Sequence, residues 1–178
     1  CGYYAVLRSG GTNASETVVI SGGGTIGLVS AAAAIGMKAR TIVVDPIGHR
    51  RDAALKLGAD AVINPAEEDA AARVMELTRG MGADLVVEAS GHDDSLGAVF
   101  DFAREDGRVA MVGINIGRKI AASLGKIQAR SLTVRGSIGS PGVWPSAIRF
   151  LERTRLDLSP LQTHDFDLAD SVAAFELG

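Results

Sequence analysis

The sequence has few of the residues that mark secreted, membrane-bound or nucleic-acid-binding proteins. Only one of its 178 residues is a cysteine, Cys1, so no internal disulfide can form. No run of about 20 apolar residues is present to span a bilayer. The start of the chain does not have the basic and then apolar pattern of a signal peptide. From these absences we expect a cytoplasmic protein with no membrane partner.

Basic charge and aromatic side chains are also scarce. The 18 Lys and Arg residues are dispersed and the net charge is −3, so we expect no nucleic-acid partner. Aromatic residues make up 4% of the chain and hydrophobic residues 47%, so Val, Ile, Leu and Ala must build the core. That composition is typical of buried parallel sheets covered by helices and favours an α/β fold. A chain of this length buries roughly 70% of its unfolded surface as one domain.

Short β-branched segments alternate with segments of helical periodicity. We predict strands at 17–20, 41–44, 61–63, 85–87, 109–112 and 132–134. We predict helices at 25–35, 50–57, 67–79 and 95–104, with Gly36, Gly58 and Gly80 as the glycines that end the first three. Parallel strands joined by right-handed helical crossovers form a doubly wound sheet of about six strands, the Rossmann arrangement, with helices on both faces.

The alternation stops near residue 139. A segment with Ser, Pro and Gly follows, then a predicted helix at 146–153 and a polar tail. We therefore predict a dinucleotide-binding domain over 1–138 and a separate segment over 139–178. Because the first residues already have the pattern of a helix, we expect this sequence to be part of a longer protein.

A glycine-rich motif lies between the first predicted strand and the first predicted helix. Gly22, Gly24 and Gly27 satisfy G-x-G-x-x-G. In that context the first glycine makes the tight turn, the second lets a diphosphate approach the backbone, and the third lets helix and strand pack closely. The amides of Thr25 and Ile26 are expected to point at the ligand, because a helix N-terminus favours negative charge. An ordinary strand-to-helix turn is the alternative.

An acidic residue supplies a second signal at the expected distance. Asp45 ends the next strand, about 20 residues beyond the motif, where a carboxylate accepts bonds from the adenosine ribose hydroxyls. Such a carboxylate repels a 2′-phosphate, so we predict NAD rather than NADP as the cofactor. Alternatively, Asp45 forms a turn before Pro46. Arg50 and Arg51 follow, and either can approach a phosphate, lie along the ribose or remain in solvent.

Three stretches give the sequence a family resemblance. They are VVISGGGTIGLVSAAAAIGMKARTIVVDPIGHRRDAALKLGADAVINP, then GADLVVEASG, then GRVAMVGI. Together with Leu57–Asp60 and the late Thr163-His164-Asp165-Phe166 segment, they resemble the cofactor-binding domain of medium-chain, zinc-dependent alcohol and polyol dehydrogenases. The resemblance covers nearly the whole chain.

The resemblance implies further cofactor contacts at the ends of the strands. Arg50 matches a basic residue on the adenosine ribose, and the remaining positions match segments whose backbone lies along the cofactor, its nicotinamide or its carboxamide. These positions are Ala89, Ser90, Val112, Gly113, Ile114, Ser137 and Ile138. In open α/β sheets, ligands lie at the carboxyl ends of strands.

The sequence also departs from this family. Members have an N-terminal catalytic domain that holds the catalytic zinc, and the sequence contains none of it. His49, His92 and His164 are isolated, without metal-ligand spacing, so we predict no metal site and no catalytic residue in this chain, and zinc only in the full-length protein. Cys1 matches either the last zinc ligand or a position beside the nicotinamide.

Two classes of function remain open at this stage. The first is the NAD-binding half of a zinc-dependent dehydrogenase that acts on a small-molecule alcohol, with a homo-oligomer as a possible assembly. The second is either a zinc-free quinone or enoyl reductase-type domain or a non-catalytic NAD-binding module. The residues upstream of Cys1 would distinguish them.

Overall fold

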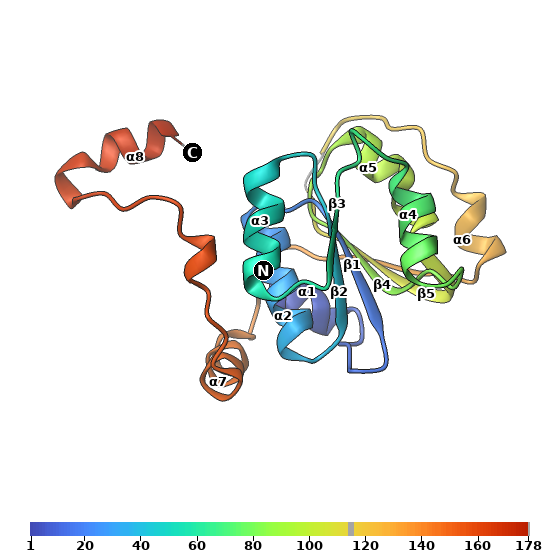
Figure 1. Cartoon of the computed structure of the whole chain (residues 1–178), viewed down its shortest axis with the longest axis horizontal. Coiled ribbons are helices and arrows are strands. Elements are labelled where there is room, and N and C mark those ends of the chain that lie inside the picture. The colour runs from blue at the N-terminus through green and yellow to red at the C-terminus, as the bar shows by residue number, and fades with distance from the viewer. Residues whose placement is uncertain (114–115, 178) are drawn as a thin grey trace.

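The structure, a computed structural model, describes residues 1–113 and 116–177 (Figure 1). Its described strands form one fully parallel sheet in the order β3-β2-β1-β4-β5-β6. The strands are β1 (Thr17–Ser21), β2 (Arg40–Val44), β3 (Ala61–Ile63), β4 (Ala83–Glu88), β5 (Ala103–Met111) and β6 (Thr133–Gly136). The predicted doubly wound α/β fold is confirmed, and its switch point lies between β1 and β4.

Helices cover both faces of the sheet (Figure 1). One face carries α1 (Gly2–Arg8), α2 (Thr25–Gly36) and α3 (Gly48–Leu57). The other carries α4 (Ala70–Leu77), α5 (Asp93–Ala98), the short 3-10 helix η1 (Val99–Asp101) and α6 (Gly125–Ala129). None of the helices in the described part of the chain is both long enough and apolar enough to cross a membrane.

The central strands form the core because both of their faces are covered. Alternate residues of β1 and β4 point to opposite faces of the sheet. Val18 and Ile20 pack under α2, whereas Val19 packs on the other face together with Val86. All four side chains are fully buried. A strand buried on both faces has no polar face, which explains the continuous apolar runs in the sequence.

The carboxyl ends of five neighbouring strands are aligned in one row. In register across the sheet, Val44 pairs with Ser21, Ser21 with Glu88, Glu88 with Met111, and Met111 with Gly136. The segments that follow these five residues therefore begin side by side at one edge of the sheet. Each predicted cofactor-binding segment starts within a few residues of this row.

One predicted helix is wrong in its C-terminal part. The helix expected at 95–104 ends at Ala98, and Ala103 and Arg104 already belong to β5. Ala103 is buried, but the three polar residues that follow it in β5, Arg104, Glu105 and Asp106, are exposed, and Asp106 has a left-handed φ of 56°. A register irregularity opposite Ala83 and Leu85 accommodates this bend. Because the strand starts with an exposed bulge, its first six residues lack the apolar pattern of a strand.

The glycines predicted to end helices have different roles. Gly58 is the left-handed C-cap of α3, as predicted. Gly80 is not the cap of α4, because Thr78 is; Gly80 lies two residues further on with φ +82°, and its amide donates to the Met75 carbonyl oxygen at 2.7 Å. Gly36 is different, because it is the last residue of α2 and Met37 is the cap. A Cβ on Gly36 would lie 2.3 Å from Cζ of Phe150. The absence of a side chain there lets a later helix pack closely.

That later helix is α7 (Trp144–Thr154), which contains the predicted 146–153 helix. It packs beside α1 and α2, with the rings of Tyr3 and Phe150 4.9 Å apart. Beyond it, the short 3-10 helices η2 (Ser159–Leu161) and η3 (Leu168–Asp170) lead to α8 (Ser171–Leu177). Figure 1 shows α8 extending away from the sheet, and none of its described residues is buried.

Candidate functional site

The turn between β1 and α2 has the geometry that the glycine motif predicts. Gly22 has φ +102°, and a Cβ there would lie 2.7 Å from the Ser90 amide nitrogen. A Cβ on Gly27 would lie 1.8 Å from the carbonyl oxygen of Gly22, so helix and strand approach too closely for any side chain. Gly24 borders open space, because no described atom beyond its chain neighbours lies within 4 Å of an added Cβ. The fold itself requires glycine at the first and third positions, because a side chain there would clash with the backbone. The second glycine borders empty space.

The N-terminus of α2 faces this space without any side chain to cap it. In the described part of the chain, no side chain caps it at the N-cap residue Gly24, and no acidic residue lies in its first turn. Thr25 and Ile26 are exposed. The first amides of a helix have no intrahelical acceptor and carry partial positive charge, so this end can bind a phosphate without a basic side chain.

Asp45 lies beside this turn and is only 2% exposed. Its Oδ2 accepts a hydrogen bond of 2.6 Å from the Gly23 amide, and its Oδ1 accepts one of 2.8 Å from the Ile47 amide. The second bond is the turn contact that formed the alternative interpretation of this residue. A carboxylate can accept roughly four hydrogen bonds, so Asp45 still has capacity for ribose hydroxyls.

The two arginines after Asp45 both contact it. An Nη of Arg50 lies 3.7 Å from Oδ2 of Asp45, and the Arg50 side chain is 41% exposed. Arg51 donates a 2.8 Å hydrogen bond to the Asp45 carbonyl oxygen. Arg51 therefore supports the end of β2, while Arg50 lies at the edge of the carboxylate with part of its side chain in solvent.

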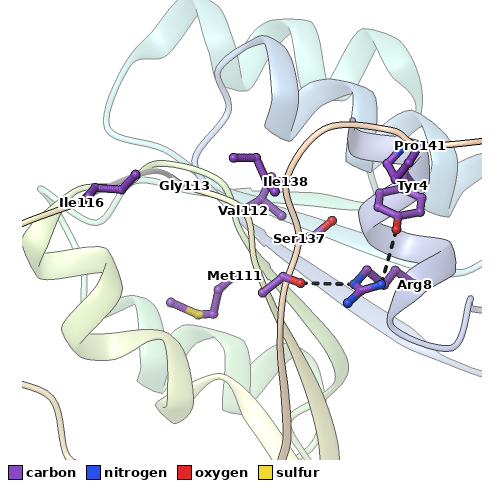
Figure 2. A pocket seen from close by; sticks show the side chains of 10 residues that line it. Tyr4, Arg8, Met111, Val112, Gly113, Ile116, Ser137, Ile138 and Pro141 are labelled. Atoms are coloured by element: carbon purple, nitrogen blue, oxygen red, sulfur yellow. Dashed lines mark hydrogen bonds between the residues drawn. The ribbon is translucent and has the colours of Figure 1, made fainter.

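A hollow of about 540 Å³ lies at the carboxyl ends of β5 and β6, farther along the row of aligned strand ends than the glycine turn (Figure 2). Val112, Gly113, Ser137 and Ile138, all predicted from the resemblance, line it. Ile114 lies outside the described residues. The other lining residues are Tyr4, Arg8, Met111, Ile116, Gly136 and Pro141. The hollow is largely apolar and lies along the same sheet edge as the glycine turn, so the row has space for a flat ring at this end.

The segment after β4 lies between the turn and the hollow. The amide of Ala89 donates to the carbonyl oxygen of Ser21 at 2.8 Å, which holds the segment to β1. Ser90 is exposed and packs under Gly22. The structure therefore brings the predicted segments together along one edge, in the order in which an extended ligand would meet them.

Among the residues at this edge that were not predicted are three that make side-chain hydrogen bonds: Arg8, Tyr4 and Glu88. Arg8 donates from Nε to the Gly136 carbonyl oxygen and from Nη to the Tyr4 hydroxyl, each at 3.3 Å, as Figure 2 shows. No sequence motif marks these two residues, because α1 precedes the Rossmann unit. The third residue, Glu88, is fully buried at the end of β4. An acidic residue ending an apolar strand was a visible signal for it.

The residues present do not fit a zinc site. Among residues 1–113 and 116–177, no three His, Cys, Asp or Glu side chains lie close enough together to hold a metal ion. Cys1 is exposed, as are His49, His92 and His164. A structural or catalytic zinc needs at least three protein ligands. We therefore assign no step in this chain to a metal.

A dinucleotide, in contrast, fits the residues present. The open space at Gly24 can take a diphosphate, the Asp45 carboxylate retains hydrogen-bonding capacity, and the hollow can take an aromatic ring. These three features follow one another along the aligned strand ends. Backbone amides lie at the phosphate position and a carboxylate lies at the ribose position, as in other dinucleotide-binding turns.

Comparison with known proteins agrees with this geometry. The zinc-binding dehydrogenase family matches residues 25–153. An L-threonine 3-dehydrogenase from Pyrococcus horikoshii is 34% identical over an alignment of 171 residues that covers 94% of this chain and 49% of that protein. An erythritol/L-threitol dehydrogenase from Mycolicibacterium smegmatis is 33% identical and covers 99% of this chain and 49% of its own length.

Solved structures agree in fold. An alcohol dehydrogenase from Thermotoga maritima superposes with a TM-score of 0.90 at 26% identity, over 99% of this chain and 50% of its own. One from Thermus sp. ATN1 gives 0.88 at 26% identity, over 99% and 52%. The chain thus spans about half the length of the relatives it matches. It belongs to the zinc-binding dehydrogenase family, as a cofactor-binding domain of the medium-chain alcohol and polyol dehydrogenase type.

Proposed function

We propose that this chain is the NAD-binding half of a zinc-dependent alcohol or polyol dehydrogenase. The observation that carries the proposal is the row of aligned strand ends. The glycine turn and Asp45 lie at the ends of β1 and β2, and the apolar hollow lies at the ends of β5 and β6. Neither the zinc-free reductase nor the non-catalytic module is favoured, since the relatives named above are alcohol, threonine and polyol dehydrogenases.

Each part of the edge has a role in this proposal. The turn with Gly22, Gly24 and Gly27 binds the diphosphate through the amides of Thr25 and Ile26. Asp45 accepts from the ribose hydroxyls, with Arg50 at its edge. The backbone of Ala89 and Ser90 lies along the cofactor, Val112 and Gly113 border the nicotinamide end, and Ser137 and Ile138 hold the carboxamide. When bound, NAD supplies a carbon that accepts or gives a hydride.

The substrate, the metal and the overall assembly belong to the longer protein. L-Threonine, erythritol and L-threitol, named for two of the relatives, suggest a small hydroxylated substrate. We propose that zinc is bound by the part of the protein outside this chain, and that 139–178 returns toward that part. A cytoplasmic location and a homo-oligomeric assembly are also proposals.

Cofactor choice is the first test of this function. We expect the chain to bind NADH at least about tenfold more tightly than NADPH, a difference of about 1.4 kcal/mol, because the Asp45 carboxylate repels a 2′-phosphate. Asp45→Ser should narrow this ratio. Titration of both cofactors, followed by nicotinamide fluorescence, measures it.

Asp60→Ser is a matched control for this substitution. The Asp60 carboxylate also accepts a hydrogen bond from a backbone amide, that of Thr41 at 2.8 Å, but near the opposite end of β2. Asp60→Ser should leave the ratio of the two affinities unchanged. Equal or reversed affinities in the unsubstituted chain would refute the role given to Asp45.

The second test concerns the chain by itself. Hydride transfer needs a substrate carbon held roughly 3–3.5 Å from the nicotinamide, together with a group that manages the alcohol proton. The described residues provide only the cofactor side. We therefore expect the purified 178-residue chain to bind NADH without stoichiometric zinc and to show no turnover with a panel of polyols and secondary alcohols. Metal analysis and a steady-state assay check this, and one zinc per chain or turnover above background would contradict it.

A further inference from the structure

A buried acid that the proposed function does not use lies at the centre of the site. Glu88 is the last residue of β4, the strand next to the switch point, and its side chain is fully buried. Isolating a carboxylate from water is costly unless hydrogen bonds compensate for the lost hydration. An apolar side chain would fill this position without that cost, so core packing does not explain an acid here.

One carboxylate oxygen of Glu88 organises the turn that follows β4. Oε1 accepts from the amides of Ser90 and Gly91 at 3.0 and 3.1 Å, and from the Ser90 hydroxyl at 2.6 Å. It also accepts from the Ser95 hydroxyl at 3.0 Å. The hydroxyls of Ser95 and Ser21 are 2.7 Å apart, which extends the network to the end of β1. The side chain thus connects two strand ends and the start of α5.

The other oxygen faces the end of β5. Oε2 has no hydrogen-bond partner within the described residues, and a Cβ on Gly113 would lie 2.4 Å from it and 2.3 Å from the Gly91 nitrogen. The main chain of Glu88 reinforces this contact, because its carbonyl oxygen accepts from Val112 and Gly113 at 2.8 and 3.0 Å. The turn after β4 and the segment after β5 therefore touch directly over the Glu88 carboxylate.

We infer that Glu88 is a positioning residue for the dinucleotide. Its carboxylate holds the Ser90–Gly91 turn against Gly22 on one side and against Gly113 on the other, so the diphosphate turn and the nicotinamide hollow keep a fixed spacing. The inference rests on the proposed function. The Asp45 carboxylate accepts from the amides of Gly23 and Ile47, and no hydrogen bond between described residues joins it to Glu88, so the adenosine end should depend much less on Glu88.

Comparison of a whole cofactor with its adenosine half tests this. Isothermal titration calorimetry with NADH and with AMP is applied to the unsubstituted chain, Glu88→Leu and Glu88→Gln. Glu88→Leu should raise the Kd for NADH at least about tenfold, the ratio that one lost hydrogen bond produces, and change the Kd for AMP by less than about threefold. Glu88→Gln keeps one acceptor oxygen and should recover most of the NADH affinity.

Asp84→Asn is the matched control, because Asp84 lies on the same strand at the opposite edge of the sheet. It accepts from the Thr17 amide at 2.7 Å and pairs with Arg104 at 2.8 Å. This variant should melt at a lower temperature while binding NADH and AMP normally. Thermal melts of all variants show whether a loss of NADH affinity comes with a loss of stability. If Glu88→Leu does not fold, the NADH and AMP titrations of Glu88→Gln test the inference.

Two results would overturn the inference while leaving the proposed function intact. One is normal NADH affinity in both Glu88 variants. The other is a parallel loss of NADH and AMP affinity that follows the melting temperature, which would make Glu88 a purely structural residue. If the unsubstituted chain bound neither ligand, the proposed function itself would fail, and this inference with it.

Discussion

Gly24→Val is expected to weaken NADH binding at least about 100-fold while the protein still unfolds cooperatively at a nearly unchanged temperature. Apart from its own chain neighbours, no atom of the described residues lies within 4 Å of a Cβ added at this position, so the folded chain has room for the new side chain. Its φ of −69° and extended ψ also suit a β-branched residue. The space that valine would occupy is the space proposed for the diphosphate, so only the complex should be affected.

Calorimetric titration with NADH and a thermal melt together measure this effect. Gly125→Val is the matched control, because Gly125 also has nothing within 4 Å of an added Cβ but lies in α6, outside the site. The control should bind NADH as the unsubstituted chain does. Retained binding by Gly24→Val would reduce the glycine motif to an ordinary turn between a strand and a helix.

Gly27→Ala should have the opposite effect, a loss of stability of about 3 kcal/mol, at the upper end of the usual cost of overpacking. The added Cβ would lie 1.8 Å from the Gly22 carbonyl oxygen and 3.4 Å from a methyl carbon of Ile20. The first of these atoms belongs to the backbone, so it can move only if the turn or the helix shifts. The third glycine of the motif is therefore needed by the fold even when no ligand is bound.

Urea unfolding measures this loss as a lower transition midpoint, and Gly125→Ala provides a control with the same change of side chain in open space. A midpoint for Gly27→Ala within error of the unsubstituted chain would show that α2 and β1 can separate at no cost. The two glycine substitutions thus distinguish the residues that the fold requires from those that the ligand requires.

The parts of the site that could be predicted are those governed by local geometry. The strand, the three glycines and the helix follow one another in the sequence, and Asp45 directly follows the next strand, so short-range spacing was sufficient to place them. The segments at Ala89, Val112 and Ser137 came from the family resemblance. Parallel pairing places them at the same edge, because it aligns the strands that precede them.

The parts that could not be predicted depend on contacts between distant residues. Gly36 has the sequence pattern of a helix end, but the structure needs glycine there because the Phe150 ring of α7 packs against it. The start of β5 is polar because it is an exposed bulge, so it lacks the apolar pattern of a strand. Arg8 reaches the Gly136 carbonyl oxygen 128 positions later, and no local pattern marks a bond of that range.

A crystal structure of the chain with bound NAD tests the central claim most directly. The account predicts one dinucleotide along the sheet edge, with its diphosphate within hydrogen-bonding distance of the Thr25 and Ile26 amides, its adenosine ribose on Asp45, and its nicotinamide in the hollow beside Val112 and Ile138. A dinucleotide bound elsewhere, or one in the reverse orientation with its adenine in that hollow, would contradict the account.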